Sequence, residues 1–372
     1  MRDPVPLELA FDMHGVRLKA RVDAPLAQRL RAILGPFEVE ASPRADFVLS
    51  IHHRTDGFQD VPRHDMEEHW RGTLPDGTAA VCHRGPGARE TLLPGLARMR
   101  LTERVADIAV APGAERYLGL GCILPALCEC LARHGHYVVH AATLAWCAAG
   151  GPPRALLLCG PGGVGKTTAA LALAHAGMHL LTDDATFLVA RPPGDTGIPP
   201  VASDTPKIPV PHRALRVWGL PRPCKVHRRT VDLLPWLRPH CQGKRAVADE
   251  FPIELSAIAG SRASEMAEPT LVLLLEERNS QAHRLRPLGK VEAVARLADE
   301  NVRAADLRGH GPAGNAFRAL AALAARTPVY LLSIGPDIET LHDTLMREEE
   351  GSVPNGVKIR HFRLKAELRT KS

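Results

Sequence analysis

The sequence predicts an α/β protein in which a sheet of buried strands is covered by helices and preceded by a separate α+β region. Three observations support this class. The chain has 372 residues, 45% hydrophobic and 24% charged, which is enough to bury a full sheet. From residue 137 onward, apolar runs of strand length alternate with helix-like runs. Between residues 6 and 112 the pattern differs, with short alternating segments around a helix.

Residues 1–112 form the first expected domain. Residues 6–52 predict short strands around one helical segment, and residues 53–90, rich in His, Arg, Gly and Asp, predict exposed loops or a small hairpin. An apolar helix-like run at 114–134 follows, and we expect it to pack on the core that comes next. We therefore place the domain boundary near residue 112.

Residues 113–345 form the expected main domain, because buried strands alternating with helices are typical of a covered α/β sheet. The expected strands are 137–146, 155–160, 179–190, 270–277 and 328–335, and the expected helices are 167–177, 291–305 and 314–326. Residues 191–252 carry many prolines and predict a lid or substrate loop. Residues 346–372 form a basic tail.

The charge distribution argues against a nucleic-acid partner. The net charge of +6 is concentrated in the C-terminal tail, and the aromatic residues, 4% of the chain, do not interleave with basic ones to make a stacking platform. The sequence has neither a secretory signal pattern near its start nor an apolar run of membrane-spanning length. We expect no membrane partner and a cytoplasmic location, where the eight scattered cysteines stay reduced.

A phosphate-binding loop is the strongest motif. The apolar run 155–159 leads into the pattern Gly, four residues, Gly-Lys-Thr, and a helix-forming run follows. Glycines let backbone N–H groups turn toward phosphate oxygens, and the helix directs its positive end at the same anion. The expected nucleotide-binding residues are Gly160, Pro161, Gly162, Gly163, Val164, Gly165, Lys166, Thr167 and Thr168. ATP and Mg²⁺ are the expected ligands, with Lys166 on the β- and γ-phosphates and Thr167 on the metal.

Two neighbouring carboxylates end the next predicted strand. Asp183 and Asp184 follow the apolar residues of 179–182, and the carboxyl end of a parallel strand faces the same crevice as the loop. Successive strand side chains point in opposite directions, which predicts unequal roles. One aspartate is expected to hold the metal or Lys166, and the other to accept a proton from a substrate hydroxyl. A solvated turn is the alternative.

His140 lies near the start of the strand that precedes the loop strand. By itself a histidine there is more typical of a packed or surface side chain.

The three features together resemble the bacterial HPr serine kinase/phosphorylase family and its kinase-only relatives. The similarity rests on VHAATLAW at 139–146, on LLLCGPGGVGKTTAALALAHAGMHLLTDD at 156–184, and on the spacing between them. Weaker similarity continues through ADENVRA at 298–304 and through the stretch 316–337.

The resemblance implies a P-loop kinase fold of the HPr kinase and phosphoenolpyruvate carboxykinase type. It implies Asp184 as the proton acceptor, Asp183 beside it as a metal ligand, and His140 as part of the site. The family's magnesium-binding glutamate has no clear counterpart, and Asp204 is a positional candidate only. The arginine segment used for phosphorolysis is not recognisable, which favours a kinase only. A homo-oligomer is expected only by analogy with the bifunctional relatives.

The acceptor stays open. Residues 1–112 look like the leading region of kinase-only relatives, some of which phosphorylate precursor peptides such as those of lasso peptides, so serine transfer to a small protein or precursor peptide is the first hypothesis. A small-molecule hydroxyl kinase and a catalytically silent, nucleotide-dependent peptide-binding regulator are the alternatives. Six basic residues either receive an acidic or phosphorylated chain or form a solvated loop: Arg213, Arg216, Arg222, Lys225, Arg228 and Arg229.

Overall fold

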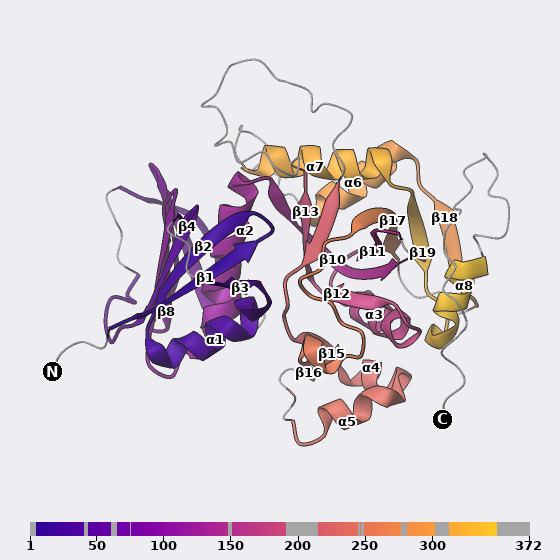
Figure 1. Ribbon diagram of the computed structural model, residues 1–372, viewed down its shortest axis with the longest axis horizontal. Helices are drawn as coiled ribbons and strands as arrows, with labels where there is room; N and C mark the ends of the chain where they lie inside the picture. The colour runs from indigo at the N-terminus through magenta and orange to yellow at the C-terminus, as the bar shows by residue number, and fades with distance from the viewer. Residues whose placement is uncertain are drawn as a thin grey trace, which may run out of the picture. The chain divides into compact units, whose positions relative to one another are not determined.

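The computed structural model describes residues 5–40, 44–60, 65–74, 76–147, 151–190, 215–244, 246, 249–276, 281–301 and 312–347. These residues form a mixed α/β structure with two large sheets, as the sequence predicts. Contacts divide them into two units, with the division in the main chain between His136 and Tyr137. Figure 1 shows the elements of both units.

The first unit contains, within its described residues, a nine-stranded sheet of order β3-β1-β2-β4-β9-β8-β7-β6-β5. Its strands are β1 (Leu7–Met13), β2 (Val16–Val22), β3 (Glu38–Val39), β4 (Phe47–His53), β5 (Glu67–Thr73), β6 (Ala79–Gly85), β7 (Ala88–Leu93), β8 (Ala97–Leu101) and β9 (Val105–Val110). Its helical segments are α1 (Ala24–Leu34), η1 (Gly35–Phe37), η2 (Glu115–Tyr117), η3 (Leu118–Ile123) and α2 (Leu124–Arg133).

The first hairpin shows how the local sequence builds this sheet. In β2 every second residue is buried, which matches the two-residue period of a strand with one face on a core. His14 and Gly15 connect β1 to β2 with φ angles of 55° and 89°, as a tight two-residue turn requires. The Gly15 N–H donates to Asp12 Oδ1 at 2.6 Å, which stabilises the turn.

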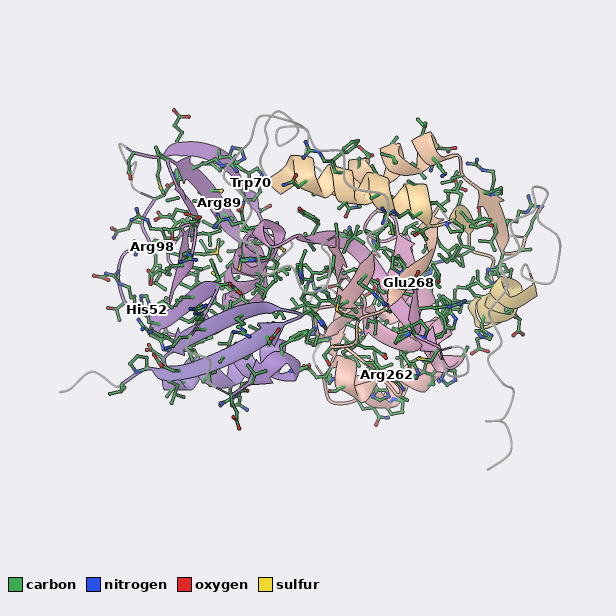
Figure 2. All side chains as sticks on the ribbon, turned by 45° about the horizontal axis from the view of Figure 1, so that its top comes forward. His52, Trp70, Arg89, Arg98, Arg262 and Glu268 are labelled. Atoms are coloured by element: carbon green, nitrogen blue, oxygen red, sulfur yellow. The ribbon has the colours of Figure 1, made fainter. Side chains whose placement is uncertain are left out.

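Helix α2 belongs to the first unit, so the expectation that the run 114–134 packs on the later core is wrong. Arg89, on β7 and labelled in Figure 2, donates through Nη1 to Glu129 Oε1 at 2.6 Å. Arg133, in the last turn of α2, donates to the backbone carbonyls of Thr102 and Glu103. The division of the chain therefore falls after α2 instead of near residue 112.

The second unit contains an eight-stranded sheet among its described residues, of order β14-β13-β10-β11-β17-β19-β18, with β12 also paired to β10. Its strands are β10 (His136–Cys147), β11 (Pro153–Cys159), β12 (His179–Thr182), β13 (Ala185–Val189), β14 (Arg216–Gly219), β17 (Glu268–Leu275), β18 (Arg284–Pro287) and β19 (Val329–Ser333). A separate pair consists of β15 (Cys224–His227) and β16 (Glu250–Ile253).

Helices cover both faces of the second sheet (Figure 1). The helical segments are α3 (Lys166–His175), α4 (Arg228–Leu233), η4 (Pro235–Leu237), α5 (Arg238–Cys241), η5 (Leu255–Ala257), α6 (Lys290–Asn301), α7 (Pro312–Arg326), η7 (Ile338–Thr340) and α8 (Leu341–Arg347). Alternate residues of β10 join opposite cores. Leu144 packs in the cluster with α3 and α8, and Ala145 packs in the cluster with α6 and α7. This two-sided burial explains the continuous apolar strands.

The directions of the strands bring the predicted site residues to one edge of the sheet. Strands β11, β17 and β19 are parallel, while β10 is antiparallel to both β11 and β12. The sheet is therefore mixed, not the parallel one assumed from sequence. The carboxyl ends of β11, β12 and β17 nevertheless share an edge with the amino end of β10, where Ala141 pairs with Cys159 and Cys159 with Leu274.

The described part of the proline-rich segment is structured, so the expectation of a loop over 191–252 is wrong for the described residues between 215 and 252. Strand β14 pairs with β13, and Trp218 stacks on Phe187 at 4.4 Å between ring centroids. Pro221 lies between β14 and β15, and Pro235 is the first residue of η4, two positions where a missing N–H does no harm. Residues 191–214 and the basic tail beyond residue 347 lie outside the described residues.

No helix among the described residues is both long enough and apolar enough to cross a membrane.

Candidate functional site

The loop between β11 and α3 has the backbone that the glycine motif predicts. Gly163 and Gly165 have φ angles of 80° and 108°, in the left-handed region where a side chain is strained. Gly165 is also the N-cap of α3. A Cβ added at Gly162, Gly163 or Gly165 would meet no atom within 4 Å. The loop therefore presents an uncrowded backbone at a helix N-terminus, which suits a phosphate group.

Lys166 holds its ammonium group inside this loop. The residue is 6% exposed, and Nζ donates to the carbonyl oxygens of Gly160 at 2.6 Å and Pro161 at 3.0 Å. Burial lowers the pKa of the Lys166 ammonium. The carboxylates of Asp184, Glu300 and Asp183 oppose that shift because they stabilise the charged form. A buried cation held by carbonyls alone would gain strongly from an anionic ligand.

The two threonines after Lys166 have different environments. Thr168 Oγ1 lies 2.8 Å from Thr230 Oγ1 on α4, and both residues are buried. Only the backbone N–H of Thr168, in the first turn of α3, is left for a phosphate. Thr167 is half-buried, and its hydroxyl makes no hydrogen bond to another described residue. Its hydroxyl can therefore serve as a metal ligand.

Asp184 is held from two sides. His140 Nε2 lies 3.2 Å from Asp184 Oδ1, and Arg222 Nη1 donates to Asp184 Oδ2 at 2.7 Å. Burial opposes ionisation of Asp184, but the two partners outweigh it and hold the pKa of this carboxyl well below its ordinary value. Asp184 thus remains a carboxylate, with its side chain 42% exposed.

Asp183 has the opposite environment. Only 6% of the residue is exposed, and burial, reinforced by repulsion from Asp184, raises the pKa of Asp183 to about 6. Its Oδ2 accepts a hydrogen bond from the Lys225 backbone N–H at 3.4 Å. The two aspartates therefore differ in exposure and in the direction of their pKa shifts.

Asn301, which was not in the predicted site, joins α6 to the strand that carries His140. Its Oδ1 accepts a hydrogen bond from the His140 backbone N–H at 2.7 Å, and its Nδ2 donates to the Leu297 carbonyl at 2.8 Å. The ADENVRA similarity at 298–304 was the only sequence signal for this residue. Its partner lies 161 positions away in the chain.

Arg222 also has a role that the sequence did not indicate. The sequence places Arg222 among basic residues that either receive an acidic chain or form a solvated loop, but its side chain is 11% exposed and paired with Asp184. Lys225, Arg228 and Arg229 of the same group are exposed, and Arg228 pairs with Asp249. Arg216 is half-buried on β14, while Arg213 lies outside the described residues.

A cavity of about 520 Å³ opens beside the loop. The first two loop residues, Gly160 and Pro161, form one wall, the end of β17 with Glu276 forms a second, and the last turns of α6 with Glu300 form a third. All three walls belong to the second unit. The cavity volume is in the range that accommodates a small ligand or a peptide side chain.

The oxygen donors at this edge fit Mg²⁺. Magnesium takes one or two protein oxygens and keeps waters and substrate phosphates as its other ligands. Thr167 and Asp183 supply a hydroxyl and a carboxylate of this kind. No group of three His, Cys, Asp or Glu side chains that could enclose a metal occurs among the residues the structure describes. Asp204, the other expected ligand, lies outside those residues.

No protein-family model matches the chain, and no curated protein matches its sequence.

Proposed function

We propose that the chain is an ATP-dependent kinase that transfers the γ-phosphoryl group to a hydroxyl, a serine of a small protein or precursor peptide, using a P-loop fold of the HPr kinase and phosphoenolpyruvate carboxykinase type. The observation that carries this proposal is the buried Lys166 ammonium, held within the glycine loop and close to two electrostatically different aspartates. A phosphate-binding loop alone indicates a nucleotide, whereas this constellation supports transfer to a hydroxyl.

In the proposed reaction, the acceptor oxygen forms a bond to the γ-phosphorus as the bond from that phosphorus to the β,γ-bridging oxygen breaks. ADP leaves with the electron pair of the broken bond, and the hydroxyl proton passes to Asp184 Oδ and then to solvent. Lys166 and the loop N–H groups stabilise the charge on the phosphate oxygens. Since phosphoryl transfer has a loose transition state, a carboxylate with a low pKa suffices to orient the hydroxyl and take its proton late.

His140 and Arg222 keep Asp184 ionised and fixed in direction. The contacts at 3.2 Å and 2.7 Å engage one oxygen each, and the exposed part of the carboxylate is left for the acceptor. When Mg²⁺ is bound, by Thr167 and Asp183, it would neutralise charge on the phosphates. Asp183 is suited to a cation because burial and Asp184 outweigh the stabilisation that Arg222 and backbone N–H groups give to its ionised form.

A second candidate is a kinase of a small molecule bearing a hydroxyl. The volume of about 520 Å³ of the cavity beside Pro161 favours it, because a space of this size can hold a metabolite.

Transfer from ATP labelled at the γ-phosphate tests the proposal. The purified chain is incubated with Mg²⁺, the labelled ATP and either a serine peptide library or a metabolite extract. Label in peptide serine supports the first candidate, and label confined to metabolites supports the second. Lys166→Met should abolish both, while Asp232→Asn, an exposed aspartate on α4, is the matched control that keeps activity. ATP binding without transfer to any hydroxyl would contradict the kinase proposal and favour the silent regulator.

A further inference from the structure

The cavity beside the loop lies at the γ-phosphate end of the proposed nucleotide site. The lysine of such a loop reaches the β- and γ-phosphates. Here its Nζ contacts the carbonyl oxygens of Gly160 and Pro161, the same two loop residues that line the cavity. Glu300, on the opposite wall, also acts electrostatically on Lys166. The cavity therefore adjoins the loop residues that Lys166 contacts, so that an acceptor bound in it would lie near the γ-phosphate.

The lining of the cavity carries an excess of negative charge. Three carboxylates, those of Glu276, Asp299 and Glu300, face one guanidinium, that of Arg296. Arg296 Nη2 is already paired with Glu292 at 3.1 Å along the same helix. Within the part of the chain that the structure describes, none of the three carboxylates forms an ion pair. Two almost fully buried leucines, Leu274 and Leu275, complete the β17 wall.

One helix end connects this cavity to the proposed catalytic base. Glu300 lines the cavity, and the next residue, Asn301, accepts the backbone N–H of His140 at 2.7 Å. His140 in turn contacts Asp184 at 3.2 Å. A side chain bound by the end of α6 is thereby held at a fixed position relative to Asp184. Such positioning lets the binding of a substrate orient its hydroxyl toward the base.

We propose that this cavity binds the acceptor segment and selects a cationic side chain, lysine or arginine, next to the hydroxyl that receives the phosphoryl group. The inference rests on the proposed kinase function and adds the charge of its substrate. It differs from the alternative of an acidic acceptor held by the basic residues, of which Arg222 is paired with Asp184. A cation near Glu276 and Glu300 would also help to offset the charge of the nearby triphosphate.

The test uses short serine peptides that differ only in having Lys, Ala or Glu beside the serine. Their affinities for the full-length chain are measured by fluorescence anisotropy with Mg²⁺ and a non-hydrolysable ATP analogue, so that binding is read without transfer. The parent should bind the Lys peptide about tenfold more tightly than the Ala peptide, as expected for a charge-assisted hydrogen bond in a partly buried site. Glu300→Gln and Glu276→Gln should remove most of this preference.

Glu268→Gln is the matched control. Glu268, labelled in Figure 2, is exposed at the opposite end of the strand that leads to Glu276, and its substitution should leave the preference unchanged. Glu300→Lys provides a further arm, because it should shift the preference toward the Glu peptide.

Equal binding of the Lys and Ala peptides by the parent would overturn the inference. So would a Lys preference that survives both Gln substitutions, or a Glu300→Gln variant that loses affinity only for the ATP analogue, which would assign the cavity to the nucleotide. The same peptides with labelled ATP separate the two proposals. Transfer without a charge preference contradicts this inference alone, whereas a Lys preference in binding without any transfer contradicts the kinase proposal alone.

Discussion

Two adjacent aspartates at the end of β12 show how much one residue's position changes its chemistry. Asp184 is paired with His140 and Arg222 and is 42% exposed, whereas Asp183 is buried and accepts only a weak backbone hydrogen bond. The pair was predictable from sequence as two acids at a strand end. The partners that keep Asp184 ionised were not predictable. Arg222 lies 38 positions further along the chain, in a segment without strand periodicity.

Asp183→Asn should stabilise the fold at neutral and alkaline pH. The folded chain keeps the Asp183 proton up to about pH 6, while an unfolded chain loses it near the ordinary value of 3.8. Ionised Asp183 therefore destabilises the folded state by an amount that grows as the pH rises between these values and is constant above about 6. Asn carries no such charge, so the variant should be more stable at pH 8 by about 3 kcal/mol.

Urea unfolding at several pH values checks this. The gain should shrink as the pH falls through 6 and vanish near 4, while transfer activity is lost throughout. A variant no more stable than the parent at pH 8 would show that burial of the ionised Asp183 side chain does not destabilise the folded state.

Arg222→Gln should move the acid limb of the kinase pH profile. In the parent, the pKa of Asp184 is so low that its protonation does not limit activity above pH 5. Without the guanidinium, burial is less strongly opposed and the Asp184 pKa rises, so kcat/KM should fall as the pH drops through a value closer to neutrality. Profiles of kcat/KM from pH 5 to 9 for parent and variant are the measurement, and two superimposable profiles after normalisation would be inconsistent with this role.

At the scale of elements, the order and direction of the strands determine the position of the site residues more than any single motif does. The loop between β11 and α3 was predictable because an apolar run, a glycine pattern and a helical run follow one another in sequence. The antiparallel course of β10 was not, because pairing partners are not encoded locally. Because β10 is antiparallel to β11, His140, near the amino end of β10, lies at the edge of the sheet where the phosphate-binding loop begins. The pairing of Ala141 with Cys159 shows this position.

Short elements were missed for a related reason. Strands β14 and β15 have four residues each, and prolines flank them, so no period could be recognised. Their positions are set instead by tertiary packing, such as the stacking of Trp218 on Phe187. Close backbone contact contributes as well, because a Cβ at Gly219 would lie 2.4 Å from the Leu181 carbonyl oxygen.

Asn301→Ala should lower the rate of transfer with little effect on ATP affinity. The substitution leaves the His140 backbone N–H without its acceptor, which loosens the link between α6 and β10. We expect kcat to fall about tenfold with an unchanged KM for ATP. Asn301→Asp retains an acceptor oxygen and should restore most of the rate. If both variants keep the parental kcat, or if Asp fails to improve on Ala, the positioning role is refuted.

At the scale of the whole molecule, each unit has its own sheet and core, and every described residue of the proposed site belongs to the second unit. Composition and pattern predicted two regions of different kind. The division was misplaced because the apolar run at 114–134 is equally typical of a helix in either core. Contacts such as Arg89 with Glu129, which decide the matter, are not visible in a pattern. The homo-oligomer expected by analogy stays a prediction.

Hydrogen exchange with and without Mg²⁺ and a non-hydrolysable ATP analogue should show protection confined to the second unit. Peptides from 155–190, 215–227 and 270–301 should slow, since they contain the loop, the aspartates, Arg222 and the end of α6. A ligand at about 100 times its Kd adds about 2.7 kcal/mol to the stability of the part that binds it. Protection centred on residues 5–110 would place the nucleotide in the first unit and contradict the assignment.

In the proposed kinase, Lys166 holds ATP so that Asp184 can assist transfer to a hydroxyl. Single-turnover transfer from pre-bound labelled ATP to a serine peptide, compared between the parent and Asp184→Asn, tests it most directly. We expect equal amounts of bound ATP in the two proteins, one ADP per phosphopeptide in the parent, and a rate at least about a hundredfold lower in the variant. Equal rates in the two proteins, or bound ATP that stays intact in the parent with every hydroxyl offered, would contradict it.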